Sequence, residues 1–469
     1  MCQRSARGSG LYNMGKASAK PLTKRVLTLG PATDALSIGE VFRFLDLADG
    51  VRINLAHATP GEVEARVRTV RTYEAERGRP LALVVDLRGP SVRVGKTPPI
   101  SVERGQEVVF KPGRESDGSF IPVPELFFAV VEPGDVVLML DGKLRMRVVS
   151  AGPGAARALA ESSGVVESGK AVVIEGKDFD LPSPTDDDIE TLRGIAHLAR
   201  EVDYVSVSLA RGCGDVEKAR AILRELGFES QVAVKIETRR AVEALEELAQ
   251  CGDYLVVARG DLGLHYGLES LPVVQRRVVY TALRLGKPVA VATQLLDSLQ
   301  SYPTPTRAEV NDVFTTASMG VDSVWLTNET ASGRYPIEAA SWLTKILNAV
   351  EYHVPQRPLP NGVRDRFAKA LVELAEDLGA DILIYSMSGA LARRVAKFRP
   401  LQLVYVGTPS MKTARALSVV WALEPHHIPA PSYEEGLAKL IAMRGKAPYV
   451  ATYGIRGGEH VIKLFIEED

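Results

Sequence analysis

The chain has 469 residues, 46% of them hydrophobic and 25% charged, with a formal net charge of −1. This composition is that of a globular protein of about three domains, and the balanced charge gives no general attraction to nucleic acid or to a membrane surface. The three cysteines, Cys2, Cys213 and Cys251, are widely spaced. They form neither a metal-ligand pattern nor a disulfide framework, and no apolar run is long enough to span a membrane, so we expect a reducing, cytoplasmic location.

The chain begins with a basic segment and continues as alternating strands and helices. Its first 25 residues hold six Lys or Arg and no acidic residue, which predicts a disordered basic tail over residues 1–22. Strand-like runs follow at residues 25–30, 51–56 and 81–89, with amphipathic helical patterns at 37–49 and 61–77. This is βα repetition, and it occupies residues 23–93.

The βα pattern stops and then resumes. Residues 94–168 contain short alternating strands separated by Gly and Pro turns, which predicts a small inserted all-β lid domain. A helix is expected at 187–199, and further strands at 204–210, 232–237, 254–259, 288–293 and 323–327. Eight strands in βα order predict a (β/α)₈ TIM barrel, whose second part covers residues 169–353.

The last unit, residues 354–469, follows a Pro-rich linker. Strands are expected at 382–385, 401–406, 449–452 and 461–466, and helices at 364–378 and 390–398. This order predicts a C-terminal open α/β domain. The whole chain is therefore of the α/β class.

Charged side chains end two of the buried barrel strands: Lys235 and Glu237 follow one, and Arg259 and Asp261 the next. Charge at the end of a buried strand is costly unless it is paired or bound to a ligand. These groups are explained either as ion pairs at the barrel rim or as a ligand site. Five other strands also end in polar residues, which favours the ligand site, because active sites of such barrels lie at this end.

The types of side chain at this end suggest the ligand. An anion is indicated by the cations at this face, Arg52, Arg93, Lys235 and Arg259. Glu237 and Asp261 would hold a hard cation such as Mg²⁺ or Mn²⁺ through oxygen ligands. Phosphoryl transfer requires positioning, a divalent ion and cations near the moving phosphoryl group. The pattern therefore predicts a phosphotransferase site.

With these residues, almost the whole chain resembles the pyruvate kinase family. The matching motifs are Lys235-Ile-Glu237, Ala258-Arg-Gly-Asp-Leu-Gly263, Gly286-Lys-Pro-Val289, Ala292-Thr-Gln294, Pro305-Thr-Arg-Ala-Glu309, Glu329-Thr-Ala331, Arg52-Ile-Asn54 and Asp86-Leu-Arg88-Gly-Pro90. The resemblance implies transfer of a phosphoryl group from phosphoenolpyruvate to ADP, giving pyruvate and ATP in glycolysis. It also implies a homotetramer.

The resemblance further implies a role for each site residue. Glu237 and Asp261 would bind Mg²⁺, and Lys235 would stabilise the transferring phosphoryl group. Arg52, assisted by Arg93, would clamp the phosphate. The N–H groups of Gly260 and Asp261, with the Thr293 hydroxyl, would bind the substrate carboxylate, and Thr293 would also lie on the proton route to the enolate. His57 and Pro31 would contact the nucleotide.

The chain departs from the family pattern at the monovalent-cation site. Asn54 and Asp86 are kept, but Ala56 stands where a serine is usual and Ser91 where a glutamate is usual. We therefore expect no requirement for K⁺; the alternative is a weakened site in which water replaces the hydroxyl. Residues 386–391, at the family's sugar-bisphosphate loop, contain no cation, so we expect no activation by fructose 1,6-bisphosphate.

Two other functions remain as alternatives. A Mg²⁺-dependent pyruvate lyase or aldolase on a related barrel would share the Glu/Asp metal pair but lack the inserted β domain. A non-catalytic binding module would not need Lys235 and Thr293. Two remaining residues have no direct contact with ligand in this scheme: Arg259 is expected to brace the site through ion pairs, and His265 is given no role.

Overall fold

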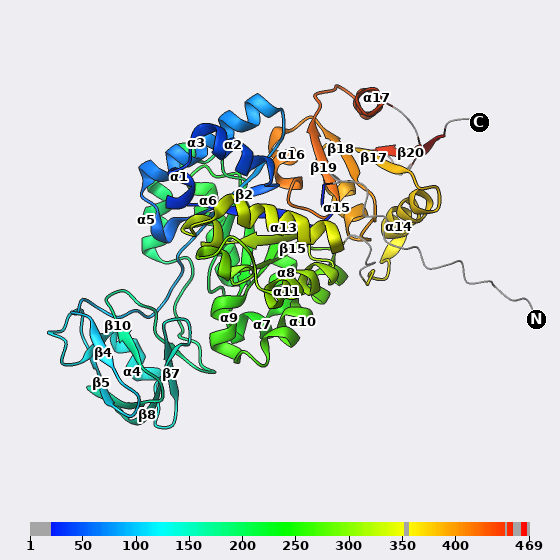
Figure 1. Cartoon of the computed structure of the whole chain (residues 1–469). Helices are drawn as coiled ribbons and strands as arrows, with labels where there is room; N and C mark the ends of the chain where they lie inside the picture. Colours follow the sequence, from blue (N-terminus) through cyan, green and yellow to red (C-terminus); the bar gives the residue numbers. More distant parts are fainter. Residues whose placement is uncertain (1–19, 351–355, 446–447, 454–460, 467–469) are drawn as a thin grey trace, which may run out of the picture.

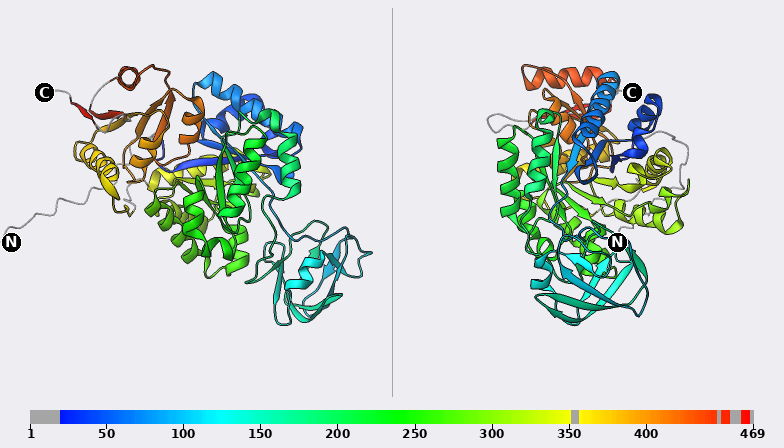
Figure 2. Two further views of the ribbon diagram at one scale, coloured as in Figure 1. Left: turned by 180° about the vertical axis from the view of Figure 1, so that it is seen from behind. Right: turned by 90° about the vertical axis from the view of Figure 1, so that its left-hand side faces the viewer.

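The computed structural model describes residues 20–350, 356–445, 448–453 and 461–466. A central barrel carries the β-rich lid at one side and the C-terminal domain at the opposite side (Figures 1 and 2). No helix among the described residues is long and apolar enough to cross a membrane.

Eight parallel strands close the barrel in the order β1-β16-β15-β14-β13-β12-β3-β2. The prediction of a (β/α)₈ barrel is therefore confirmed. The layer beneath the helices is filled mainly by Val, Leu, Ile and Ala side chains, and the interior by Val and Ala with Tyr204, Tyr254 and Trp325, as expected of strands covered on both faces. The strands are β1 (Lys24–Leu29), β2 (Gly50–Asn54), β3 (Ala82–Asp86), β12 (Tyr204–Val207), β13 (Gln231–Ile236), β14 (Tyr254–Ala258), β15 (Val289–Ala292) and β16 (Ser323–Leu326).

Helices surround the barrel, and their ends follow local sequence signals. The helix α3 begins at Pro60 because Thr59 and Glu62 form a capping box, and it ends where Gly78 takes a left-handed conformation. The helical elements of the barrel are α1 (Pro31–Asp34), α2 (Ile38–Asp46), η1 (Leu55–His57), α3 (Pro60–Arg77), α5 (Asp186–Gly194), η2 (Ala196–Leu198), α6 (Cys213–Glu225), α7 (Arg239–Glu243), α8 (Leu245–Cys251), α9 (Arg259–Tyr266), α10 (Leu271–Leu285), η3 (Asp297–Gln300), α11 (Arg307–Ser318), α12 (Asn328–Ala331) and α13 (Pro336–Val350).

The lid is a separate β domain with its own core around Phe110 and Phe127. It contains a six-stranded sheet, β11-β7-β8-β9-β5-β6, and the pair β10-β4. Since β11 pairs with β7, the lid sheet extends past residue 168, where the sequence pattern placed its end. Its elements are β4 (Ile100–Val102), β5 (Glu107–Pro112), β6 (Ile121–Val123), α4 (Glu125–Val130), β7 (Val136–Met139), β8 (Leu144–Gly152), β9 (Ala155–Ala160), β10 (Gly164–Val166) and β11 (Val173–Ile174).

The C-terminal domain is an open sheet of order β19-β18-β17-β20-β21, in which only β21 is antiparallel. Strand β19 was not expected, because Pro425, His426 and His427 are not typical strand residues. The elements are α14 (Gly362–Asp377), β17 (Asp381–Tyr385), α15 (Ala390–Ala396), β18 (Val404–Thr408), α16 (Met411–Leu417), β19 (Leu423–His427), α17 (Tyr433–Arg444), β20 (Tyr449–Tyr453) and β21 (Ile462–Phe465).

This domain closes the end of the barrel at which the strands begin. Tyr204 and Tyr254, the first residues of β12 and β14, donate hydrogen bonds to the carbonyls of Ala416 and Val419. A buried ion pair of 2.7 Å between Arg399 and Asp322 adds a further link. The opposite end of the barrel, where the strands finish, faces the lid (Figure 1).

The end of the predicted basic tail is ordered. Leu22 is 4% exposed and packs in the core of the C-terminal domain, and its carbonyl accepts the N–H of Ala422 at 2.8 Å. Lys20 pairs with Glu424. The prediction of disorder is therefore wrong for residues 20–22, because the apolar side chain of Leu22 is buried in the C-terminal domain. Residues 1–19 lie outside the described part.

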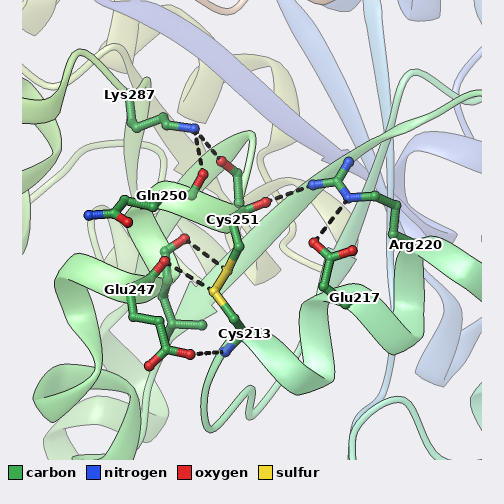
Figure 3. The surroundings of a disulfide bond; sticks show 9 residues. Cys213, Glu217, Arg220, Glu247, Gln250, Cys251 and Lys287 are labelled. Atoms are coloured by element: carbon green, nitrogen blue, oxygen red, sulfur yellow. Dashed lines mark hydrogen bonds and ion pairs between the residues drawn. A yellow bond between two sulfur atoms is a disulfide. The ribbon is translucent and has the colours of Figure 1, made fainter.

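Two of the three cysteines form a disulfide, which corrects the expectation drawn from their spacing. Cys213 begins α6 and Cys251 ends α8, and their Cα atoms lie 6.0 Å apart. In Figure 3, Glu247 accepts the Cys213 N–H and Arg220 donates to the Cys251 carbonyl, so polar contacts also join the two helices. Residues 38 positions apart were brought together by helix packing, which spacing alone did not reveal.

Candidate active site

The predicted polar residues of neighbouring strands lie together at the end of the barrel that faces the lid. Asn54 and Asp86 end the adjacent strands β2 and β3, and they are in register with each other. Lys235 lies on β13 and Glu237 directly follows that strand. Because parallel strands finish at the same edge, residues far apart in sequence share one small volume.

Lys235 lies at the centre of this volume. Its Nζ is 3.2 Å from Glu237 Oε2 and 3.7 Å from Asp86 Oδ2, and it donates to Ser208 Oγ at 3.0 Å. Burial alone would lower the pKa of this ammonium group, but the carboxylates of Asp86, Glu237 and Asp261 raise it above its ordinary value. Lys235 is therefore a fixed positive charge at neutral pH and not a base.

Glu237 is fully buried. One carboxylate oxygen accepts the Leu209 N–H at 2.6 Å, whereas the other, Oε2, is buried without a hydrogen bond. Burial, together with the charges of Asp261 and Asp86, raises the pKa of this carboxyl group, although Lys235 lowers it. This buried oxygen faces the Lys235 ammonium group at 3.2 Å but accepts no hydrogen bond, so it can still serve as a ligand of a cation.

Asp261 is the second candidate metal ligand. It lies in the first turn of α9, directly after β14, and its side chain is exposed. No three His, Cys, Asp or Glu side chains converge as metal ligands in the part of the chain that the structure describes. Two carboxylates with substrate and water oxygens are nevertheless the usual way in which Mg²⁺ is held beside a phosphate.

Arg52 and Asp86 form a buried pair that the sequence did not suggest. Arg52 Nε donates to Asp86 Oδ2 at 2.8 Å, and Nη1 donates to Thr28 Oγ1 at 3.1 Å. The sequence assigned Asp86 only to a monovalent cation. Strand register did not reveal the pair, because Arg52 lies opposite Val84, whereas the residue opposite Asp86 is Asn54.

Thr293 and Gln294 follow β15 in the left-handed region, with φ values of 72° and 52°. Such a conformation costs of order 1–3 kcal/mol for a residue other than glycine and is kept only when its surroundings enforce it. The Thr293 hydroxyl accepts the Gly260 N–H at 2.9 Å and donates to the Ala292 carbonyl at 2.6 Å. These contacts link β15 to the start of α9.

The remaining predicted residues lie around this centre. Arg93 is held at the lid junction, where it donates to Ser91 Oγ and to the Gly169 carbonyl, both at 2.8 Å. Pro31 is the first residue of α1, and His57 ends η1 with its side chain exposed. Partial desolvation by the surrounding protein, and then the positive charges of neighbouring arginines, lower the pKa of His57.

The comparisons with known proteins agree with this geometry. The family model described as pyruvate kinase, barrel domain, matches residues 20–340, and the model described as pyruvate kinase, alpha/beta domain, matches residues 365–459. The chain belongs to the pyruvate kinase family. It is a phosphotransferase of glycolysis that uses phosphoenolpyruvate and ADP.

Individual relatives give the same result. The chain is 63% identical to a pyruvate kinase of Pyrobaculum aerophilum, over 95% of this chain and 97% of that protein, and 36% identical to one of Aeropyrum pernix, over 89% and 91%. A crystal structure of the pyruvate kinase from Pyrobaculum aerophilum matches with a TM-score of 0.91, covering 96% of this chain and 100% of the other. A pyruvate kinase from Cryptosporidium parvum, 24% identical with a TM-score of 0.85 over 95% and 96% of the two chains, shares the fold. A pyruvate lyase or aldolase is not favoured.

Proposed function

We propose that Glu237 and Asp261 hold the divalent cation of this pyruvate kinase, Mg²⁺ or Mn²⁺. The observation that carries this proposal is the Oε2 atom of Glu237, which is buried without a hydrogen bond and lies 3.2 Å from Lys235 Nζ, with the charges of Asp261 and Asp86 close enough to raise the pKa of the carboxyl group. A bound divalent ion would supply charge neutralisation for the phosphoryl oxygens.

In the proposed mechanism the protein acts chiefly through fixed charges. Lys235 would stabilise the phosphoryl group as its bond to the enolate oxygen of phosphoenolpyruvate breaks and a bond to the terminal phosphate oxygen of ADP forms. Arg52, oriented by Asp86 and Thr28, would clamp the phosphate, with assistance from Arg93. The enolate left behind would take a proton at its methylene carbon to become pyruvate.

We propose that Thr293 serves both the substrate carboxylate and this proton. Its hydroxyl lies beside the Gly260 N–H at the first turn of α9, where backbone N–H groups have no helical partner and favour an anion. The Gly260 N–H donates to Thr293 Oγ1, so a bound carboxylate would take over or share this donor. Pro31 and His57 would contact the nucleotide.

Equilibrium binding of Mn²⁺, followed by electron paramagnetic resonance of the free ion, tests the metal site directly. Glu237→Gln keeps the size of the side chain but removes its charge, so Mn²⁺ binding should weaken at least tenfold. Glu269→Gln, an acidic side chain outside the proposed site, is the matched control and should bind Mn²⁺ as the wild type does. Unchanged binding by Glu237→Gln would refute the assignment.

We further propose that the enzyme does not require K⁺. Asn54 Oδ1 accepts the Ala56 N–H at 3.1 Å and Asp86 Oδ2 is bound by Arg52, whereas Asp86 Oδ1 is buried without a hydrogen bond. The proposal therefore rests on Ala56, the departure from the family pattern. Ala56 offers no hydroxyl. Turnover in tetramethylammonium chloride should therefore match that in KCl at equal ionic strength, whereas strong activation by K⁺ would contradict the proposal.

Three broader proposals rest on the family and on the sequence. We propose a cytoplasmic homotetramer that fructose 1,6-bisphosphate does not activate. Structural disulfides are rare in reducing compartments, so the location is proposed from the family and the Cys213–Cys251 bridge gives it no support. Light scattering measures the oligomer, and calorimetric titration with fructose 1,6-bisphosphate, for which we expect no binding heat, tests the effector.

A further inference from the structure

A buried carboxylate lies where the chain returns from the lid to the barrel. We name residues 175–181 the return arm. Asp178 on this arm has a side chain that is 8% exposed. It accepts the backbone N–H of Arg240 at 2.9 Å and that of Arg239 at 3.4 Å. On its other side, Oδ1 lies 2.9 Å from Nδ1 of His265.

Asp178 joins α9, which carries the proposed metal ligand Asp261, to α7, which begins two residues after the other ligand, Glu237. Arg239 and Arg240 begin α7, which follows Glu237 after a single residue. His265 lies one turn after Asp261 on α9. Asp178 therefore bridges the segment behind one metal carboxylate and the helix that bears the other.

A second contact between the same helices supports this connection. The guanidinium group of Arg239 lies over the ring of Tyr266, 4.8 Å from its centre. The start of α7 and the end of α9 thus meet at two points. Asp178 is the member of this cluster that belongs to the return arm.

Helix α9 also touches the lid itself. Leu264 packs against Val136, Leu138 and Val173 of the lid sheet. Adjacent residues of α9 therefore contact the lid through Leu264 and the return arm through His265. The helix whose first turn holds Asp261 thus contacts both the lid and the return arm.

The His265 contact is close but not that of an aligned hydrogen bond. The ring is 6% exposed, and Nδ1 is buried without a hydrogen-bond partner although Asp178 Oδ1 is within 2.9 Å. A buried polar atom without a hydrogen bond costs folding free energy, so its presence here calls for an explanation. If Asp178 served only to hold the lid, its partner His265 would not need to lie on α9, the helix that carries Asp261.

We propose that Asp178 and His265 are positioning residues that fix α7 relative to α9 and so set the spacing of Glu237 and Asp261. The proposal rests on the metal site put forward above. Groups that orient metal ligands commonly change metal affinity 10- to 100-fold when removed. Asp178 and His265 touch neither substrate nor metal in this scheme; they act through Glu237 and Asp261.

The test is Mn²⁺ binding to the full-length enzyme by electron paramagnetic resonance. Asp178→Ala and His265→Ala should each weaken Mn²⁺ binding about tenfold. The double variant should be little weaker than either single variant, because both act through one contact. Asp178→Asn keeps an oxygen for the Arg240 N–H and should show a smaller loss.

Lys177→Gln is the matched control. Lys177 precedes Asp178 on the return arm, but its ionic partners, Glu132 and Asp135, both belong to the lid. This variant should bind Mn²⁺ as the wild type does. Thermal unfolding of every variant shows whether stability changes separately from Mn²⁺ affinity.

The outcomes separate the two proposals. If Glu237→Gln loses Mn²⁺ binding while Asp178→Asn, Asp178→Ala and His265→Ala bind as the wild type does, the positioning role is overturned and the metal site stands. A fall in unfolding temperature with unchanged Mn²⁺ affinity has the same meaning. If Glu237→Gln binds Mn²⁺ normally, the metal site itself fails, and the positioning role with it.

Discussion

Arg259 holds Thr293 in its left-handed conformation: its Nε donates to the Thr293 carbonyl at 3.1 Å. The same guanidinium group binds the Gln294 carbonyl and pairs with Asp312 at 2.7 Å. The bracing role expected of Arg259 is thus visible as direct contacts to two strained residues. The strained backbone is that of Thr293, the residue whose hydroxyl we propose for substrate binding and proton delivery.

Removal of this brace should impair catalysis more than stability. In Arg259→Met, Thr293 can relax toward an ordinary conformation, so its hydroxyl would leave its place beside Gly260. We expect kcat to fall 10- to 100-fold, with a thermal midpoint shifted by only a few degrees. Steady-state kinetics with calorimetry measure both, and Arg307→Met, on the exposed start of α11, serves as the control. Wild-type kcat in Arg259→Met would contradict the bracing role.

Lys235→Met tests the central charge. The ammonium group interacts with three carboxylates and is proposed to meet the phosphoryl group as it moves, so its loss should lower kcat by several orders of magnitude. The affinity for phosphoenolpyruvate should change little. A coupled assay and fluorescence titration separate these effects. A variant with wild-type turnover would eliminate Lys235 from catalysis.

The disulfide should contribute to stability but not to turnover. It closes a loop between residues 38 positions apart, which in the chain-entropy model corresponds to roughly 3–4 kcal/mol. Cys213→Ser with Cys251→Ser should lower the unfolding midpoint by several degrees, and a reducing agent should do the same to the wild type only. Equal midpoints in all four samples would show that the bridge is without effect.

The stability should also depend on pH through Asp203. Burial raises the pKa of this carboxyl group to about 6, although Arg71 and the Leu83 N–H favour its ionised form. A carboxyl group whose pKa is higher in the folded state than in the unfolded state destabilises the fold when it ionises. This penalty is absent below pH 3.8, develops between pH 3.8 and 6, and is complete above pH 6.

The free energy of unfolding of the wild type, relative to Asp203→Asn, should therefore fall by up to about 3 kcal/mol from pH 4 to pH 7. Urea unfolding of both proteins at a series of pH values measures this slope. The fixed offset caused by the lost contact with Arg71 does not affect it. A slope of zero or of opposite sign would show that Asp203 ionises in the folded protein as easily as in the unfolded one.

The sequence predicted what depends on local pattern and missed what depends on packing. The eight βα units and the polar strand ends were recognisable because each depends on the pattern of a few consecutive residues. Lys235 and Glu237 do lie together at the end of the barrel. The disulfide, the Arg52–Asp86 pair and the Asp178–His265 contact join residues from separate elements. Spacing along the chain carries no signal for such meetings.

Predictions from local sequence also failed at two places, Leu22 and strand β19. Leu22 ends a polar, basic stretch, yet it is buried by the C-terminal domain. Strand β19 contains a proline and two histidines, yet it pairs with β18 at the edge of the sheet. In both cases the tertiary environment, which composition does not report, determined the structure.

The hydrogen bond between Leu22 and Ala422 has a consequence for how the chain folds. It joins residues that are separated by four hundred positions, immediately before the first barrel strand. During synthesis the barrel can assemble from its own eight units, but the residues that lead into it stay without their partner until the last domain has been made. Leu22, which is synthesised four hundred residues before Ala422, is thus among the last residues to reach its final contacts, and long-range contacts of this kind form slowly.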